Sequence, residues 1–253
     1  MKDLEDEPLF MELSRSDQQK RGGSTAFLSR CPGDILKDRL DLYRRTILFH
    51  IHAKLDDVTY LEIEVLEHKQ NINAKDELGR TALHYACHYG AGKAVRFLLQ
   101  QQALIDEADS DMRWTALHYA SLGGYERIVK SILTQAPAAD ITQNRKDKNG
   151  TTPLMLAAGE NHSSAVNILL QMGTHVNATD NEGWTALHYA TAKDAALTAE
   201  VLIRYKADTN MKILVTNETP LELSYRLNSS LVGRQLVEAA HASTTHAKAK
   251  LGL

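Results

Sequence analysis

A six-residue phrase that returns along the chain at a nearly fixed interval is the strongest constraint on its fold. The phrase Thr-Ala-Leu-His-Tyr-Ala begins at Thr81, Thr115 and Thr185. A variant, Thr-Pro-Leu-Met-Leu-Ala, begins at Thr152, and a fainter copy, Thr-Pro-Leu-Glu-Leu-Ser, begins at Thr219. Successive threonines are 34, 37, 33 and 34 residues apart. A period of this length is typical of repeat proteins, in which similar supersecondary units stack on one another.

The remainder of each unit repeats as well. An apolar stripe with spacings of three and four follows each phrase, within residues 94–99, 128–133, 166–170 and 201–203. This spacing predicts a second helix with one apolar face. A polar turn containing Asn, Asp and Gly then ends the unit, most clearly at residues 73–79 and 177–183. Asn or Asp followed by Gly favours a tight turn with positive φ.

The phrase, its period and the Asn-Ala-x-Asp-x-x-Gly turn resemble those of the ankyrin repeat over roughly residues 46–240. The resemblance implies an all-α solenoid of about five ankyrin repeats, each with two antiparallel helices and a hairpin-like loop that projects sideways. It also implies that the chain works by binding a partner protein.

Several segments depart from the repeat pattern. Residues 46–76 resemble a degenerate first repeat that starts with Thr46 and lacks both the His of the phrase and the mid-repeat Gly. The turn before Trp114 has one extra residue and no Gly, and the turn at residues 138–150 has about four extra residues. The link at residues 210–218 has lost both the Asp and the Gly. We expect these loops to leave the regular geometry.

The ends of the chain differ in composition from the repeats. Residues 1–30 carry mixed charge and few apolar residues, so we expect a disordered leader. Residues 31–240 are expected to form the ankyrin-repeat domain, and residues 241–253 a flexible tail. A helix with Asp34 as its N-cap is expected to cover the first repeat. Its predicted packing face consists of Leu36, Leu40, Tyr43, Ile47 and Ile51.

Composition and charge exclude several classes of function. The net charge of −3 gives the chain no general attraction to nucleic acid, and its apolar runs are too short for membrane insertion. Cys31 and Cys87 cannot build a disulfide framework, which favours a reducing, intracellular location, cytoplasmic or nuclear. We expect a chain that is monomeric by itself and holds no cofactor.

Two residue types offer chemistry that must be weighed against a structural role. His84, His118 and His188 occupy one repeat position, where bonds to turn backbone are expected and a metal row is the alternative. The pair His84 and His88 has zincin spacing, but Tyr85 replaces the Glu that a zincin needs. Cys87 is expected to be a buried small hydrophobe. Without a phosphate loop or a catalytic motif, we expect no enzyme; the alternative is a small enzyme or metal-binding protein that uses the His row.

Two variable positions of the repeat predict the partner-binding site. One follows the His of the phrase, and the other precedes its Thr. Residues at these positions should form a ladder along the concave face and loop tips, where Trp, Tyr and Arg are typical of interfaces. The ladder consists of Arg80, Tyr85, Trp114, Tyr119, Leu156, Trp184 and Tyr189, with Thr151 at the remaining position. The alternative for the tyrosines is local packing against the next repeat. The expected role is that of an adaptor, scaffold, inhibitor or assembly subunit.

Overall fold

The chain is built from helix pairs joined by long hairpin loops. A computed structural model describes the backbone of residues 32–136 and 142–251. Residues 1–42 and 43–253 form separate units, and of the first unit only the beginning of helix α1 is described. Within the described residues there is no β-strand, only an isolated bridge between Ala108 and Thr115. The fold is all-α, as the repeat pattern predicts.

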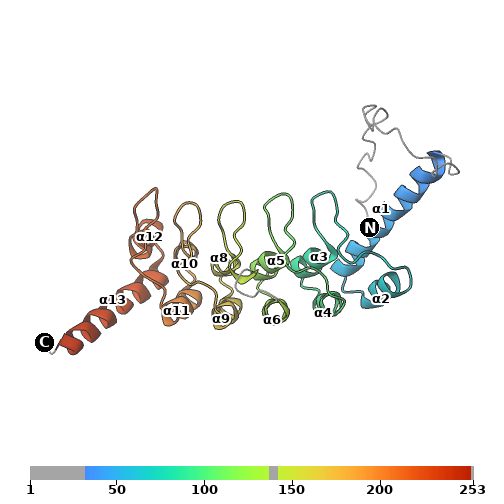
Figure 1. Cartoon of the computed structure of the whole chain (residues 1–253). Helices are drawn as coiled ribbons and strands as arrows, with labels where there is room; N and C mark the ends of the chain where they lie inside the picture. The colour runs from blue at the N-terminus through green and yellow to red at the C-terminus, as the bar shows by residue number, and fades with distance from the viewer. Residues whose placement is uncertain (1–31, 137–141, 252–253) are drawn as a thin grey trace, which may run out of the picture. The chain divides into compact units, whose positions relative to one another are not determined.

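The helices of residues 43–251 form two rows. The first helices of the pairs pack on one another in the order α3, α5, α8, α10 and α12, and the second helices in the order α4, α6, α9, α11 and α13 (Figure 1). The bounds are α1 Pro32–Lys54, α2 Val58–Leu66, α3 Ala82–His88, α4 Gly92–Gln100, α5 Ala116–Leu122, α6 Glu126–Gln135, α8 Pro153–Gly159, α9 Ser163–Gln171, α10 Ala186–Ala192, α11 Ala196–Arg204, α12 Pro220–Leu227 and α13 Ser230–Leu251.

Each first helix starts at the Thr of the phrase because that residue caps it. Thr81, Thr115 and Thr185 have extended backbone and form capping boxes with the His three positions later. Such caps satisfy N–H groups that the first turn of a helix leaves without intrahelical partners. The leucine two positions after each of the first four threonines is at most 2% exposed, so the core runs without interruption through these repeats.

The face of α1 that packs on the repeats is not the predicted one. Phe49, His50 and Ala53 are buried, whereas Ile47 and Ile51 of the predicted stripe are exposed. Leu40 and Tyr43 are exposed as well, and the side chain of Leu36 lies outside the described residues. The helix begins at Pro32, so Asp34 lies inside it and is not its N-cap. The apolar stripe misled the prediction because α1 has apolar residues on more than one face.

The first repeat also contains a histidine at the position of the phrase histidine, where the sequence pattern predicted none. Asp56 has a φ of 59° at the position of Gly90, whose φ is 73°. This register places His50, not Phe49, opposite His84. His50 Nε2 lies 3.0 Å from the carbonyl oxygen of Ala74, which mirrors a bond made by His84 in the next repeat. The sequence alignment from Thr46 was wrong by one residue.

At the other end, α12 and α13 form the last helix pair. Helix α13 packs on α10, α11 and α12 and continues to Leu251, so the backbone of the expected flexible tail is helical. The expected leader, Cys31 and most of the extra residues at 138–150 lie outside the described residues. In the described part of the chain, no helix combines the length and the apolar character that crossing a membrane requires.

The orientation of α1 predicts different effects for two of its apolar side chains, which are two positions apart in the sequence. We expect Phe49→Ala to lower the free energy of unfolding by about 3–5 kcal/mol, because it removes a completely buried ring. The matched change Ile51→Ala removes a side chain that is 41% exposed and should cost less than about 1 kcal/mol. Urea unfolding followed by circular dichroism measures both. A larger loss for Ile51→Ala would mean that the predicted stripe is the packing face after all.

Candidate interaction surface

One aspartate organises each of four hairpin loops. Asp76 Oδ1 accepts the backbone N–H groups of Leu78 and Arg80 at 2.9 and 2.8 Å. Asp147 and Asp180 accept bonds from the same two positions of their loops, and Asp109, whose loop has one extra residue, accepts the N–H groups of Met112 and Trp114. Because one carboxylate oxygen closes the turn, the other oxygen is directed to a side chain.

The loops are also tied to one another through their backbones. The N–H groups of Ser110, Lys148, Asn181 and Leu214 each donate to a carbonyl oxygen of the preceding loop, at 2.8, 3.0, 2.9 and 2.8 Å. In Figure 1 these loops project on the same side of the helix pairs. The hairpins therefore form a connected surface, here called the loop-side surface, together with the first helices beneath them.

The three tyrosines of the predicted ladder brace this surface. Their hydroxyls donate to the second oxygen of the loop aspartate, from Tyr85 to Asp76, Tyr119 to Asp109 and Tyr189 to Asp180, at 2.7–2.8 Å. Burial and the neighbouring carboxylate raise the pKa of Tyr85 to about 12 and also raise the pKa of the other two. All three rings are half-buried, so local packing accounts for part of each side chain.

The ladder changes where Leu156 replaces a tyrosine. Leucine has no hydroxyl, and Asp147 Oδ2 instead accepts the indole N–H of Trp114 from the preceding repeat at 2.9 Å. The Trp114 ring lies parallel to His118, with centroids 6.3 Å apart, and edge-on to Tyr119 at 5.2 Å. Trp114 is half-buried, so it contributes to the fold as well as to the surface.

The second tryptophan has a different environment. The aspartate that Trp184 would reach in the next loop is replaced by Ile213, which is buried. Among the described residues, the Trp184 indole N–H therefore has no hydrogen-bond partner. Its ring lies 5.5 Å from that of Tyr189 and borders a pocket of about 400 Å³. The pocket is lined by Asn149, Thr151, Asp180, Asn181, Glu182, Trp184 and Tyr189.

Arg80 occupies the position of the tryptophans in the first complete repeat. Its Nε donates to Asp76 Oδ2 at 3.0 Å, and its guanidinium lies 4.7 Å above the Tyr85 ring. The side chain therefore lies on the loop-side surface, held in one orientation by an ion pair and a cation–π contact.

The loop aspartates and the tip of the last hairpin were not among the predicted site residues. Leu214 and Val215 are 73% and 80% exposed at this tip. A sequence signal for them exists, because the apolar run Ile213-Leu214-Val215 stands where the other loops are polar. The hydrogen bonds of the loop aspartates could not be read from the sequence, because a polar turn is expected to contain such residues anyway.

The three histidines of the row form hydrogen bonds with backbone groups. In each of His84, His118 and His188, Nδ1 accepts the N–H of the capping threonine at 3.0–3.2 Å. Nε2 of His84 and of His118 lies 3.1–3.3 Å from carbonyl oxygens of the next loop. The buried Nε2 of His188 lies close to carbonyls of the irregular last loop but forms no hydrogen bond of good geometry. The described residues contain no cluster of three potential metal ligands.

The other candidate chemistry also has a structural explanation. Cys87 is completely buried, and burial raises the pKa of its thiol, which disfavours the reactive thiolate.

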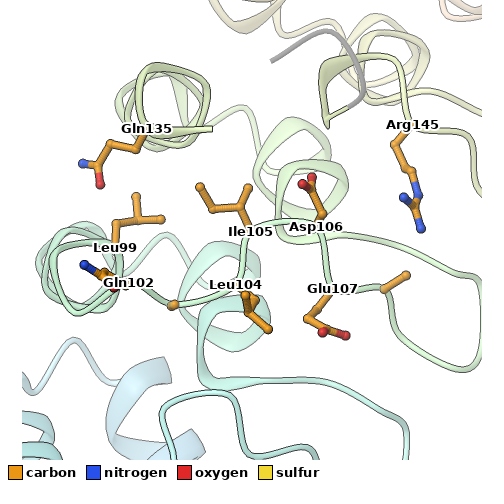
Figure 2. A pocket seen from close by; sticks show the side chains of 10 residues that line it. Leu99, Gln102, Leu104, Ile105, Asp106, Glu107, Gln135 and Arg145 are labelled. Atoms are coloured by element: carbon orange, nitrogen blue, oxygen red, sulfur yellow. The ribbon is translucent and has the colours of Figure 1, made fainter. Parts of the chain in front are cut away.

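The cavity in Figure 2, of about 910 Å³, is lined by apolar and polar residues between α4, α6 and the loop after α4. Its carboxylates Asp106 and Glu107 already bind Thr142 and Lys75, and the described residues that line it include no Ser, Cys or His.

The buried histidines predict a pH dependence of stability. Burial lowers the pKa of His118 to about 4 and also lowers those of His50, His84 and His188. The unfolded chain therefore binds more protons below pH 6.5, and stability falls as the pH drops from 6.5 toward 4. Each histidine contributes at most about 1.4 kcal/mol per pH unit.

Urea unfolding between pH 7 and 5 tests this dependence, because this window lies above the ordinary pKa of most carboxylates. His118→Met is the matched variant, since Met155 occupies the same position in the next repeat. We expect a smaller pH slope in the variant than in the unchanged chain. Equal slopes would show that His118 titrates normally in the folded protein.

Comparison with known proteins agrees with this geometry. The family profile described as ankyrin repeats (3 copies) matches residues 48–145 and 139–213. The human transient receptor potential cation channel subfamily A member 1 is 32% identical over 144 residues, 57% of this chain and 12% of that protein. Neurogenic locus notch homolog protein 1 of Xenopus tropicalis is 35% identical over 152 residues, which are 60% of this chain.

The same Notch protein of Danio rerio is 32% identical over 161 residues, 63% of this chain. The similar regions span only 6% of the length of either Notch protein, so the likeness concerns the repeats and not the whole relatives. The profile match covers more than half of the chain, and it coincides with the capped helix pairs and the Asp-closed hairpins. The chain belongs to the ankyrin-repeat family.

Proposed function

We propose that this chain binds a partner protein through its loop-side surface. Ankyrin repeats are generally protein–protein interaction modules. The proposed contact residues are Arg80, Tyr85, Trp114, Tyr119, Leu156, Trp184 and Tyr189, extended at the last hairpin by Leu214 and Val215. The observation that carries the proposal is Trp184, a large aromatic side chain that borders a pocket and whose N–H group has no partner among the described residues.

The bonding of the loops supports this role. Aspartate bonds close four hairpins, and backbone bonds join each hairpin to the next. A surface that is already ordered loses little conformational entropy when a partner binds. Arg80 and the tyrosines are likewise held by their aspartates before any contact is made.

The chemistry of the exposed groups supports it as well. Tryptophan, tyrosine and arginine dominate the energetics of most interfaces, and an apolar side chain at an exposed tip gains free energy when it is covered. Leu214 and Val215 lie one loop away from Trp184, whose own loop accepts the Leu214 N–H. The Trp184 ring beside the exposed Leu214 and Val215 can bind a peptide segment of the partner.

In this proposal, binding a partner is the whole activity of the chain. The chain acts as an adaptor, scaffold, inhibitor or assembly subunit, in the cytoplasm or nucleus, without a cofactor and as a single copy. The scaffold does not name the partner, because the same repeat carries different surface residues in each protein. The channel and receptor activities named for the relatives are not part of the proposal.

Trp184→Ala separates binding from folding. We expect the variant to lose about 1 kcal/mol or less of unfolding free energy, because the Trp184 indole N–H bonds to no other described residue. Binding of the natural partner should fall by about 30-fold or more, as for a central interface tryptophan. Trp114→Ala should cost more stability, about 2–3 kcal/mol, because it also breaks the bond to Asp147.

The measurement is a quantitative pull-down from cell extract, followed by titration of the partner that it identifies. Lys130→Ala, an exposed change on the outer helix α6, is the control and should leave capture unchanged. If the folded Trp184→Ala protein captures the same partner with unchanged affinity, the loop-side surface is not the binding face.

A further inference from the structure

The first complete repeat shows what an aspartate–tyrosine pair of this fold can bind. Asp76 Oδ2 accepts the Tyr85 hydroxyl at 2.8 Å and, at the same time, the Nε–H of Arg80 at 3.0 Å. The guanidinium of Arg80 lies 4.7 Å above the ring of Tyr85. The pair thus holds an arginine through its carboxylate and its aromatic face together.

The pair formed by Asp180 and Tyr189 has the same geometry without the arginine. The Tyr189 hydroxyl donates to Asp180 Oδ2 at 2.8 Å, and Asp180 Oδ1 closes the turn as Asp76 Oδ1 does. Trp184 stands at the position of Arg80, so the chain supplies no guanidinium here. A pocket of about 400 Å³ borders these residues.

The charges around this pocket favour a cation. Of the described residues that line it, only Asp180 and Glu182 are charged, and both are acidic. Glu182 is exposed and forms no ion pair with any described residue. Trp184 and Tyr189 add aromatic surface, on which an arginine side chain stacks well because its guanidinium is planar and weakly hydrated.

The first and third complete repeats do not offer the same opening. The second has the same set of Asp109, Tyr119 and Trp114, but there the indole N–H is held by Asp147. In the third complete repeat Leu156 replaces the tyrosine, and the indole of Trp114 already occupies Asp147 Oδ2. In the first, Arg80 fills the site from within the chain. The absence of an aspartate at Ile213 removes the bond that would hold the Trp184 indole in the same way as that of Trp114.

We propose that the pocket beside Trp184 binds an arginine side chain of the partner protein, between the Asp180 carboxylate and the Trp184 and Tyr189 rings. The proposal rests on the proposed function and names the chemistry of the partner at this point. The Trp184 indole N–H and the exposed Leu214 and Val215 contact the peptide on either side of the arginine.

Nuclear magnetic resonance can test this pocket without a known partner. The chain has two tryptophans, so its indole N–H region contains two signals, which Trp114→Phe assigns. The probe is N-acetyl-arginine amide, and N-acetyl-citrulline amide is its uncharged isostere. We expect the Trp184 signal to shift and saturate with a dissociation constant on the order of millimolar. The Trp114 signal, held by Asp147, should stay in place.

Two variants test the acidic charge beside the pocket and the comparison with Arg80. Glu182→Gln should weaken arginine amide about threefold, whereas Glu126→Gln, an exposed change on α6, should not. Trp184→Arg should recreate the Arg80 arrangement within the chain and abolish binding, as followed by the backbone signal of Gly183. An unmoved Trp184 signal, an equal response to citrulline amide, or full affinity in Trp184→Arg would overturn the proposal.

Failure of this proposal can be told apart from failure of the proposed function. If Trp184→Ala loses the natural partner but arginine amide leaves the Trp184 signal unmoved, the loop-side surface stands and its arginine assignment is wrong. If arginine amide binds but Trp184→Ala retains the partner, the pocket exists and the partner docks elsewhere.

Discussion

A buried histidine that joins two repeats is the interaction on which the rest of the structure depends. Its Nδ1 accepts the N–H of the threonine that starts its own helix, and in His84 and His118 its Nε2 meets a carbonyl of the next loop. Nδ1 as acceptor requires the proton on Nε2, so the neutral ring is fixed in one tautomer. The same burial that lowers the pKa of these rings therefore keeps them suitable for both bonds.

The loop aspartates fix the conformation of the hairpins that project from the helices. Each closes its hairpin with one oxygen and uses the other for whatever side chain the repeat presents. Tyrosine takes it in three repeats, and where Leu156 cannot, Trp114 reaches across from the neighbouring repeat. Small changes at two variable positions thus decide which side chains bind each carboxylate, and Asp180, which accepts the Tyr189 hydroxyl, also lines a pocket.

The fold was largely predictable, but the ends and the site were less so. The phrase at Thr81, Thr115 and Thr185 predicted the capped helices correctly, because the threonine and histidine that repeat are the residues that make the cap. The stripe of α1 gave the wrong face, since apolar spacing alone does not say which of two apolar faces is covered. The three ladder tyrosines bind their loop aspartates in the same way, yet the hydrogen bond of a ladder tryptophan depends on the next loop.

The sequence by itself determined the repeat, the start of each first helix at the threonine of the phrase and the polar turns between repeats, because these follow from local capping, turn chemistry and periodicity. Only the tertiary structure decided how the two tryptophans differ. Trp114 and Trp184 occupy equivalent positions in sequence, but the next loop offers Asp147 to one and Ile213 to the other. Hydrogen bonds between residues 33 positions apart exist only once the repeats have stacked, and they leave Trp184, not Trp114, beside an open acidic pocket.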